Sequence, residues 1–389
     1  MLKWFNNLTN AEKIAVAAIV VPVVVVVIGG LFGKKDDPSL PQPKIRQRGT
    51  DHTAVVAEND GVAVAGGDGA VQQVTVDRSQ RHEGGVSIDN VEAGATVNIT
   101  VINYVDGLPQ SPNPEVRRLF EEASALSASG EYIKAVEGFK KCLTLENDPE
   151  KRGALNLQIG NCYYNLRKYL NAAEYYSGAL KLSRKARDLE GEAAAQASIA
   201  NTYLLRTAAT GPSRGANIRK AVELYAAALE IYKKDEYPVD YAATQNNLGT
   251  AYTALPAATS EERAENVRKA IECYRAALEI RKKDEYPVDY AMTQNNLGTA
   301  YTYLPAATSE ERAENVRKAI ECYRTALEIR KKDEYPQFYC QTTANMGLLL
   351  ASIDGEEACY WLREAYSLRE YLEDQGKRLE EVIENVCKD

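Results

Sequence analysis

Side chains that could act as nucleophiles, general bases or metal ligands are scarce in this sequence. Its 389 residues include two histidines, His52 and His82, and seven cysteines that lie far apart. Both histidines stand in a Gly-rich stretch, so Ser-His-Asp, Cys-His and His-rich metal sites are not predicted. No two cysteines are spaced as C-x-x-C, which argues against a zinc ribbon or a disulfide scaffold. The sequence therefore predicts no enzyme, no cofactor and no metal site.

The charge of the chain argues against nucleic acid as a partner. It carries 47 basic and 55 acidic side chains, for a formal net charge of −8. No basic run of five residues is present, and neutralising phosphates needs clustered Lys and Arg. Cysteines taken as unpaired fit a reducing compartment.

The side chains that could instead bind a partner are amides and hydroxyls in a long repeat. Residues 231–279 and 280–328 match at 45 of 49 positions, and such a period indicates stacked supersecondary units. In each copy small and large residues recur at helical spacing, as in Gly249, Tyr252, Ala270 and Tyr274. This pattern predicts two antiparallel helices, with small residues where the backbones approach and tyrosines filling the gap beside them.

The pattern resembles the tetratricopeptide repeat, Leu-Gly-x-x-Tyr followed by Ala-x-x-x-Phe/Tyr-x-x-Ala. Other copies of it are found at Ala123, Leu126, Ala135, Phe139 and Cys142; at Gly160, Tyr163, Ala172, Tyr176 and Ala179; at Ala200, Tyr203, Ala221, Tyr225 and Ala228; and at Gly347, Leu350, Ala358, Leu362 and Ala365. With a final helix over 377–387, the resemblance implies a mostly α fold. We expect a right-handed superhelix of about six helix hairpins over residues 113–389.

The repeat departs from the usual period of about 34 residues. Pro256 should stop the first helix, and Thr259-Ser260-Glu261-Glu262 has the form of a capping box, so the second helix should start early. After this second helix, Pro287 should end or break the helical pattern. These long repeats are similar to those of kinesin light chains and of prokaryotic signalling proteins, and a signalling role is an expectation by analogy.

The family resemblance also implies where a partner would bind. First helices of the family line a concave groove, and Asn and Thr side chains there can both donate to and accept from an extended peptide. Carried over position by position, the groove residues are Asn161, Asn201, Asn246, Thr250, Thr253, Met292, Asn295, Thr299, Thr302 and Tyr303.

The near-identical copies differ at four places, and two of these fall on groove positions. The pairs are Tyr232/Arg281, Ala243/Met292, Ala254/Tyr303 and Ala276/Thr325. The larger side chains at Met292 and Tyr303 indicate a groove specialised after duplication. Drift at exposed sites is the alternative.

The N-terminal region, residues 1–35, predicts a membrane anchor. Ile14–Phe32 is uncharged over 19 residues, about 28 Å as a helix. A cleaved signal peptide is the rival interpretation. Five basic residues follow this stretch and two precede it, which favours a single-pass cell-membrane protein with a cytoplasmic C-terminal body.

A Pro-rich linker over 36–52 leads to a stretch, 53–110, that alternates Val or Ile with small and polar residues. The alternation predicts short strands, although a flexible spacer is a rival interpretation. So few strands make a thin core, and a homo-oligomer through this segment or the span is a further expectation.

The function expected from these features is a membrane-anchored scaffold that binds a protein or peptide in its groove. The alternative is a membrane sensor-effector, in which clustering of the β segment and the transmembrane helix perturbs the membrane.

Overall fold

A computed structural model of the chain describes residues 111–205, 212–371 and 375–387, together with five short strands between residues 54 and 99. The chain divides into two compact units. One unit contains strands β1 to β3, and the other contains β4, β5 and the described helices.

Thirteen α-helices make up nearly all of the described residues beyond residue 110. They are α3 (Pro114–Ala128), α4 (Tyr132–Leu145), α5 (Pro149–Asn165), α6 (Tyr169–Ala186), α7 (Leu189–Leu205), α8 (Pro212–Ile231), α9 (Pro238–Ala254), α10 (Ser260–Ile280), α11 (Pro287–Tyr303), α12 (Ser309–Leu327), α13 (Pro336–Leu350), α14 (Gly355–Tyr366) and α15 (Gln375–Val386), with a short 3₁₀ helix η4 (Arg369–Tyr371) before α15.

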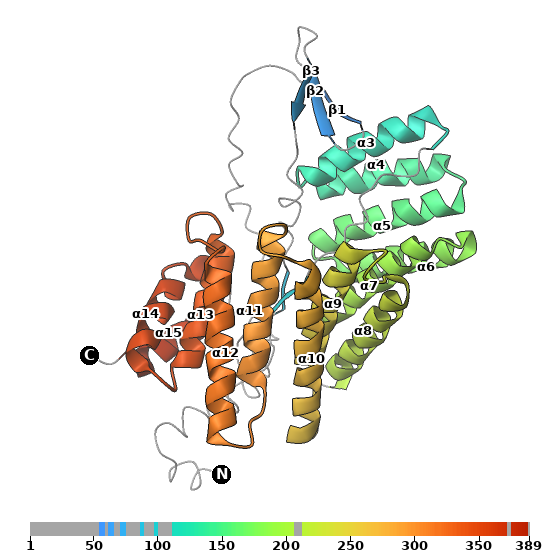
Figure 1. Ribbon diagram of the computed structural model, residues 1–389. Coiled ribbons are helices and arrows are strands. Elements are labelled where there is room, and N and C mark those ends of the chain that lie inside the picture. The colour runs from blue at the N-terminus through green and yellow to red at the C-terminus, as the bar shows by residue number, and fades with distance from the viewer. Residues whose placement is uncertain are drawn as a thin grey trace, which may run out of the picture. The chain divides into compact units, whose positions relative to one another are not determined.

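Consecutive helices pack as hairpins, from α3 with α4 through α13 with α14, and α15 packs against α14 (Figure 1). We call the two members of each pair its first and second helix. Each second helix also lies against the first helix of the next hairpin. The predicted mostly α fold of six hairpins and a final helix is therefore confirmed.

The ends of the helices follow from local sequence. Thr259 caps α10 by accepting a hydrogen bond from the backbone N–H of Glu262 at 3.1 Å, and α10 then runs for 21 residues, as the capping box predicts. The prediction for Pro287 was wrong, because this residue begins α11 instead of breaking a helix. Proline suits the first turn, where its missing N–H has no intrahelical acceptor and its φ is already helical.

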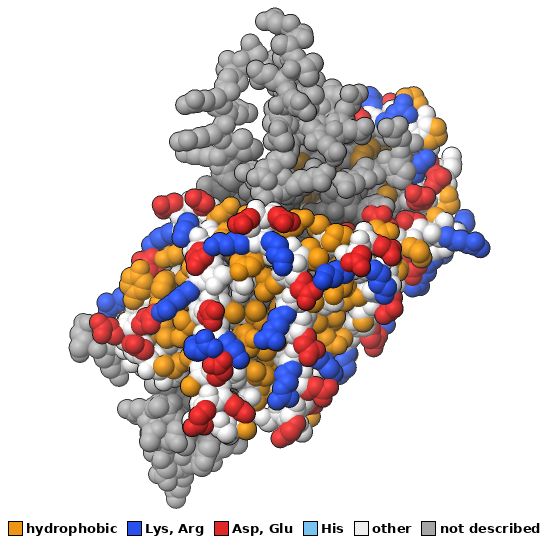
Figure 2. Space-filling view, viewed as in Figure 1, with side chains coloured by type: hydrophobic (Ala, Val, Ile, Leu, Met, Phe, Trp, Pro, Cys, Tyr) orange, Lys and Arg blue, Asp and Glu red, His pale blue; other side chains and the backbone are white. Residues whose placement is uncertain are grey.

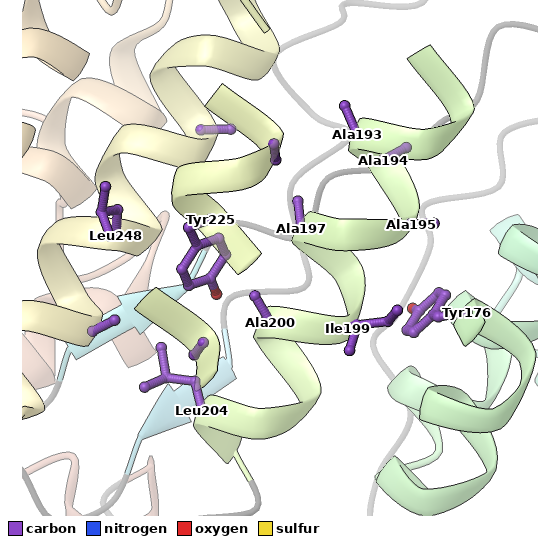
Figure 3. Packing of buried hydrophobic residues seen from close by; sticks show 14 of the residues in the cluster. Tyr176, Ala193, Ala194, Ala195, Ala197, Ile199, Ala200, Leu204, Tyr225 and Leu248 are labelled. Carbon is purple, nitrogen blue, oxygen red and sulfur yellow. The ribbon is translucent and has the colours of Figure 1, made fainter. Parts of the chain in front are cut away.

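The second to fifth hairpins are each held together by a tyrosine of the second helix packed over a small residue of the first helix. Tyr274 and Tyr323 are fully buried, and a Cβ added at Gly249 or Gly298 would lie 2.8 Å from the respective ring. Tyr176 and Tyr225 lie on either side of α7, whose alanines let the neighbouring helices approach closely (Figure 3). The glycines and alanines of the repeat thus make room for the rings.

The near-identical copies are joined to their neighbours in the same way. Lys234, just after α8, pairs with Glu279 near the end of α10 at 2.6 Å, and Lys283 pairs with Glu328 after α12 at the same distance. All four side chains are largely exposed, so these ion pairs contribute little to stability. They do show that the two copies pack against the preceding repeat in the same register.

The strands form two separate antiparallel sheets. β1 (Ala54–Glu58), β2 (Gly61–Ala65) and β3 (Val71–Val74) pair in the order β1-β2-β3. β4 (Val86–Ile88) pairs with β5 (Val97–Ile99) in the register Val86↔Ile99. β5 also lies against α9 and α11 of its own unit. The rest of 53–110 lies outside the described residues, so a β-rich segment as a whole stays a prediction, as do the domain boundaries.

The predicted localisation as a single-pass cell-membrane protein was wrong. In the part of the chain that the structure describes, none of the helices combines the length and the apolar character that a bilayer span requires. Ile14–Phe32, the stretch predicted to span, lies outside the described residues.

The expectation that all cysteines are unpaired also needs correction. Cys359 on α14 and Cys387 after α15 form a disulfide, with Cα atoms 5.4 Å apart. Cys273 and Cys322 are buried thiols, and burial raises the pKa of each to about 12. They therefore stay protonated at neutral pH and act as small packing residues.

Candidate functional site

Four predicted groove residues hold the tyrosine of their own second helix. Each follows the small residue that the tyrosine covers, and each is within hydrogen-bond distance of its hydroxyl. The pairs are Tyr176 with Asn161, Tyr225 with Asn201, Tyr274 with Thr250 and Tyr323 with Thr299. Burial raises the pKa of Tyr323 to about 12, so its hydroxyl keeps its proton. These four side chains therefore fix the two helices of a hairpin to each other.

Asn246 and Asn295 link successive hairpins instead. Asn296 Nδ2 donates to Asn246 Oδ1 at 3.2 Å, and Asn345 Nδ2 donates to Asn295 Oδ1 at 3.3 Å. A similar bond runs from Asn247 to Asn201 at 3.2 Å. A line of amide contacts, here called the Asn ladder, thus crosses the first helices α7, α9, α11 and α13. Each of these side chains is at most 4% exposed.

The donors of the Asn ladder were not among the predicted site residues. They are Asn247, Asn296 and Asn345, each two places before the glycine of its repeat. The signal in the sequence was the Asn-Asn doublet that both near-identical copies carry. Two neighbouring helical positions point about 100° apart, so the two amides of a doublet cannot both face one groove. The second amide of the doublet faces the neighbouring hairpin.

The other predicted residues differ in how open they are. Thr253 is fully buried and donates to the carbonyl of Gly249 at 2.9 Å, while Thr302 is half-buried and makes the equivalent bond to Gly298 at 3.0 Å. Met292 is 6% exposed. Tyr303 is partly exposed, and the guanidinium of Arg263 lies 5.4 Å from its ring centre. Met292 and Tyr303, the two enlarged side chains of the second copy, thus both belong to α11.

One hydrogen-bonding atom of the Asn ladder has no hydrogen-bond partner. Asn295 is fully buried and its Oδ1 accepts from Asn345, but its Nδ2 lies in the interior with neither donor hydrogen satisfied. Leaving a buried amide donor unsatisfied costs about 1–3 kcal/mol. This atom is therefore a candidate contact for a ligand that brings an acceptor.

Two open hollows on the described surface, of about 460 and 450 Å³, lie elsewhere. One is at the end of α3, lined by Leu126 and its neighbours, and the other is on α12 and its C-cap. None of the predicted groove residues lines either hollow.

The comparisons with known proteins agree with this fold. The tetratricopeptide repeat family model matches residues 154–185. No curated protein gives a significant match. The structure of the apo form of RapI is 18% identical and has a TM-score of 0.51, over 69% of this chain and 95% of that chain.

Two further solved structures are similar. BtubC from P. vanneervenii is 20% identical with a TM-score of 0.45, over 67% of this chain and 93% of that one. The nearly identical TPR-like repeats of a Podosopora anserina putative kinesin light chain are 19% identical with a TM-score of 0.41, over 58% of this chain and 99% of that one. The family match identifies a tetratricopeptide repeat over residues 154–185, and the likeness to RapI supports the fold of stacked helix hairpins described above.

Proposed function

We propose that this protein is an interaction scaffold that binds an extended segment of a partner protein against the first helices α9 and α11. Solenoids of this kind present one continuous surface built from successive repeats, and such surfaces serve for binding. The observation that carries the proposal is the unsatisfied Nδ2 of Asn295 within the Asn ladder. A peptide carbonyl is the acceptor that this amide lacks.

The neighbouring side chains suit a partner segment of mixed character. Met292 supplies a flexible apolar contact, and the Tyr303 ring with Arg263 beside it supplies an aromatic and a cationic one. On the face seen in Figure 2, Lys and Arg alternate with Asp and Glu over the described residues, without a large patch of one sign. Recognition should therefore depend on backbone hydrogen bonds and local packing more than on long-range charge.

Affinity capture with the full chain tests the proposal. We expect a prey protein that binds wild type and is reduced at least tenfold by Asn295→Leu combined with Tyr303→Ala. The prey would then be cut into overlapping peptides, and one extended peptide should reproduce the binding.

Thr325→Ala is the matched control, because it replaces a residue of α12 with the residue found in the preceding copy. It should leave capture unchanged. Equal capture by wild type and the Asn295/Tyr303 variant, with helicity retained, would show that α9 and α11 are not the binding surface.

A further inference from the structure

The side of α9 and α11 predicted to face a groove is not open in this structure. Asn246, Thr250, Asn295 and Thr299 are each 0% exposed. Contacts within the helical array contribute to this burial, since Thr250 and Thr299 meet the tyrosine hydroxyls of α10 and α12. A helix of an open solenoid should keep a solvent-facing stripe along its groove side.

The strand β5 (Val97–Ile99) lies where this surface is closed. Its main helix neighbours are α9 and α11, the first helices of two successive hairpins. Figure 1 shows the strand beside these two helices. Because α9 and α11 also contact each other, β5 lies along their junction, which the Asn246–Asn296 bond crosses.

The backbone of β5 has hydrogen-bonding capacity to spare. It pairs with β4 through one edge, in a sheet of two strands, and among the strands that the structure describes none pairs with its other edge. Unpaired strand edges present a row of N–H and C=O groups that must find other partners. Amide and hydroxyl side chains such as those of the Asn ladder can serve both kinds of group.

We propose that β5 is an intramolecular ligand of the α9–α11 surface, so that this surface is closed in the isolated chain. A partner segment must then be an extended strand that displaces β5. The inference rests on the proposed function only in placing the external partner on the same surface.

Because β5 is part of the same chain as the α9–α11 surface, we can state how strongly it should weaken the binding of a partner segment. A ligand tethered in the same chain has an effective concentration on the order of 1 mM. If β5 itself binds the open surface with a Kd of about 100 μM, a competing free peptide would bind the closed chain roughly tenfold more weakly than the open one.

A labelled synthetic peptide of residues 94–103, GATVNITVIN, is the probe. Its affinity is measured for the full chain and for the full chain with Val97→Pro and Ile99→Pro, which removes backbone donors from β5. Binding should be about tenfold tighter to the proline variant than to wild type. A second variant, Val86→Pro with Ile88→Pro, breaks the same hairpin through β4 and carries the test if the first fails to fold, as judged by circular dichroism.

The matched control is Val62→Pro with Val64→Pro, the same change at the same spacing in β2 of the other unit, and it should bind the peptide as wild type does. Equal affinity for wild type and both hairpin variants, or no binding to any of them, overturns the inference. The two proposals fail in different ways. If a captured prey depends on Asn295 but not on the integrity of β5, the scaffold function is supported and β5 is not an intramolecular ligand. If the peptide binds as expected but no prey is captured, β5 is an intramolecular ligand and the scaffold function is not supported.

Discussion

The tyrosine hydroxyls show how a residue of the repeat can be essential to packing and polar at once. Each ring covers a glycine or alanine, and each hydroxyl reaches an Asn or Thr on the facing helix. A buried hydroxyl without a partner would cost free energy, so the polar residue after the small one is needed wherever the second helix carries tyrosine. In the sixth hairpin Leu362 packs over Gly347 instead.

Tyr274→Phe should therefore destabilise the protein although the ring remains. It removes a hydroxyl that lies 3.2 Å from Thr250 Oγ1 and 3.5 Å from Thr253 Oγ1. We expect a loss of about 1 kcal/mol in the free energy of unfolding, measured by urea denaturation. Tyr252→Phe, the same deletion on a partly exposed ring, is the control and should change the free energy by less than half as much. Equal losses would mean that the hydroxyl of Tyr274 has no special role.

Two buried arginines occupy equivalent places but differ in their partners. Arg281 pairs with Asp289 at 3.3 Å and donates to Thr293 at 2.9 Å. Arg330 donates to Thr342 at 2.8 Å and stacks on Phe338, with no carboxylate within salt-bridge distance among the described residues. Burial lowers the pKa of Arg330 to about 9. The first guanidinium is compensated by an ion pair and the second is not.

Replacing each arginine by Met should consequently have opposite effects. Arg281→Met leaves Asp289 buried without its cation and should cost about 3 kcal/mol, whereas Arg330→Met should be neutral or stabilise by about 1 kcal/mol. Urea midpoints of the two variants against wild type give the comparison. A large destabilisation by Arg330→Met would reveal a counter-charge for this guanidinium.

At the scale of helices and hairpins, the pattern of small residues and tyrosines was sufficient to predict six hairpins and a final helix. Each copy carries its own packing information, so the prediction needed no long-range contact. Pro287 was misjudged because a proline between two helical stretches can end one or begin the next, and only the cap geometry decides. The Cys359–Cys387 disulfide was missed because it depends on how α15 packs on α14, which no local pattern specifies.

The site was predicted less well than the fold. Family positions identified residues on the first helices, but they could not show that Asn161, Asn201, Thr250 and Thr299 are engaged by tyrosines of the second helices. Nor could they show that β5, far away in sequence, lies against α9 and α11. Both facts depend on side chains or strands that meet only after folding.

The disulfide should matter mainly for α15. It closes a loop with a sequence separation of 28, for which the chain-entropy model gives about 3–4 kcal/mol. Cys359→Ser with Cys387→Ser should therefore speed hydrogen exchange of the α15 amides, while those of α9 and α11 keep their wild-type rates. Adding reductant should reproduce this in wild type and have no effect on the double variant. Unchanged exchange in α15 would show that packing alone, through buried residues such as Leu379, holds the helix.

At the scale of the whole molecule, the Asn ladder connects hairpins three to six, and the Asn-Asn doublets that carry it from one hairpin to the next belong to the fourth and fifth. The enlarged residues Met292 and Tyr303 and the unsatisfied Asn295 all belong to the fifth hairpin. Binding specificity is therefore expected to concentrate in the C-terminal half of the array, with the N-terminal hairpins serving to support it.

The matching registers of the two near-identical copies have an evolutionary consequence. The Lys234–Glu279 and Lys283–Glu328 pairs, and the Asn296–Asn246 and Asn345–Asn295 bonds, are the same contacts made twice, one repeat apart. A further 49-residue copy inserted between them would meet a surface that it already fits on either side. Unequal recombination can thus lengthen or shorten the gene by whole units without inventing an interface. The number of hairpins is then a trait that selection can adjust in single steps.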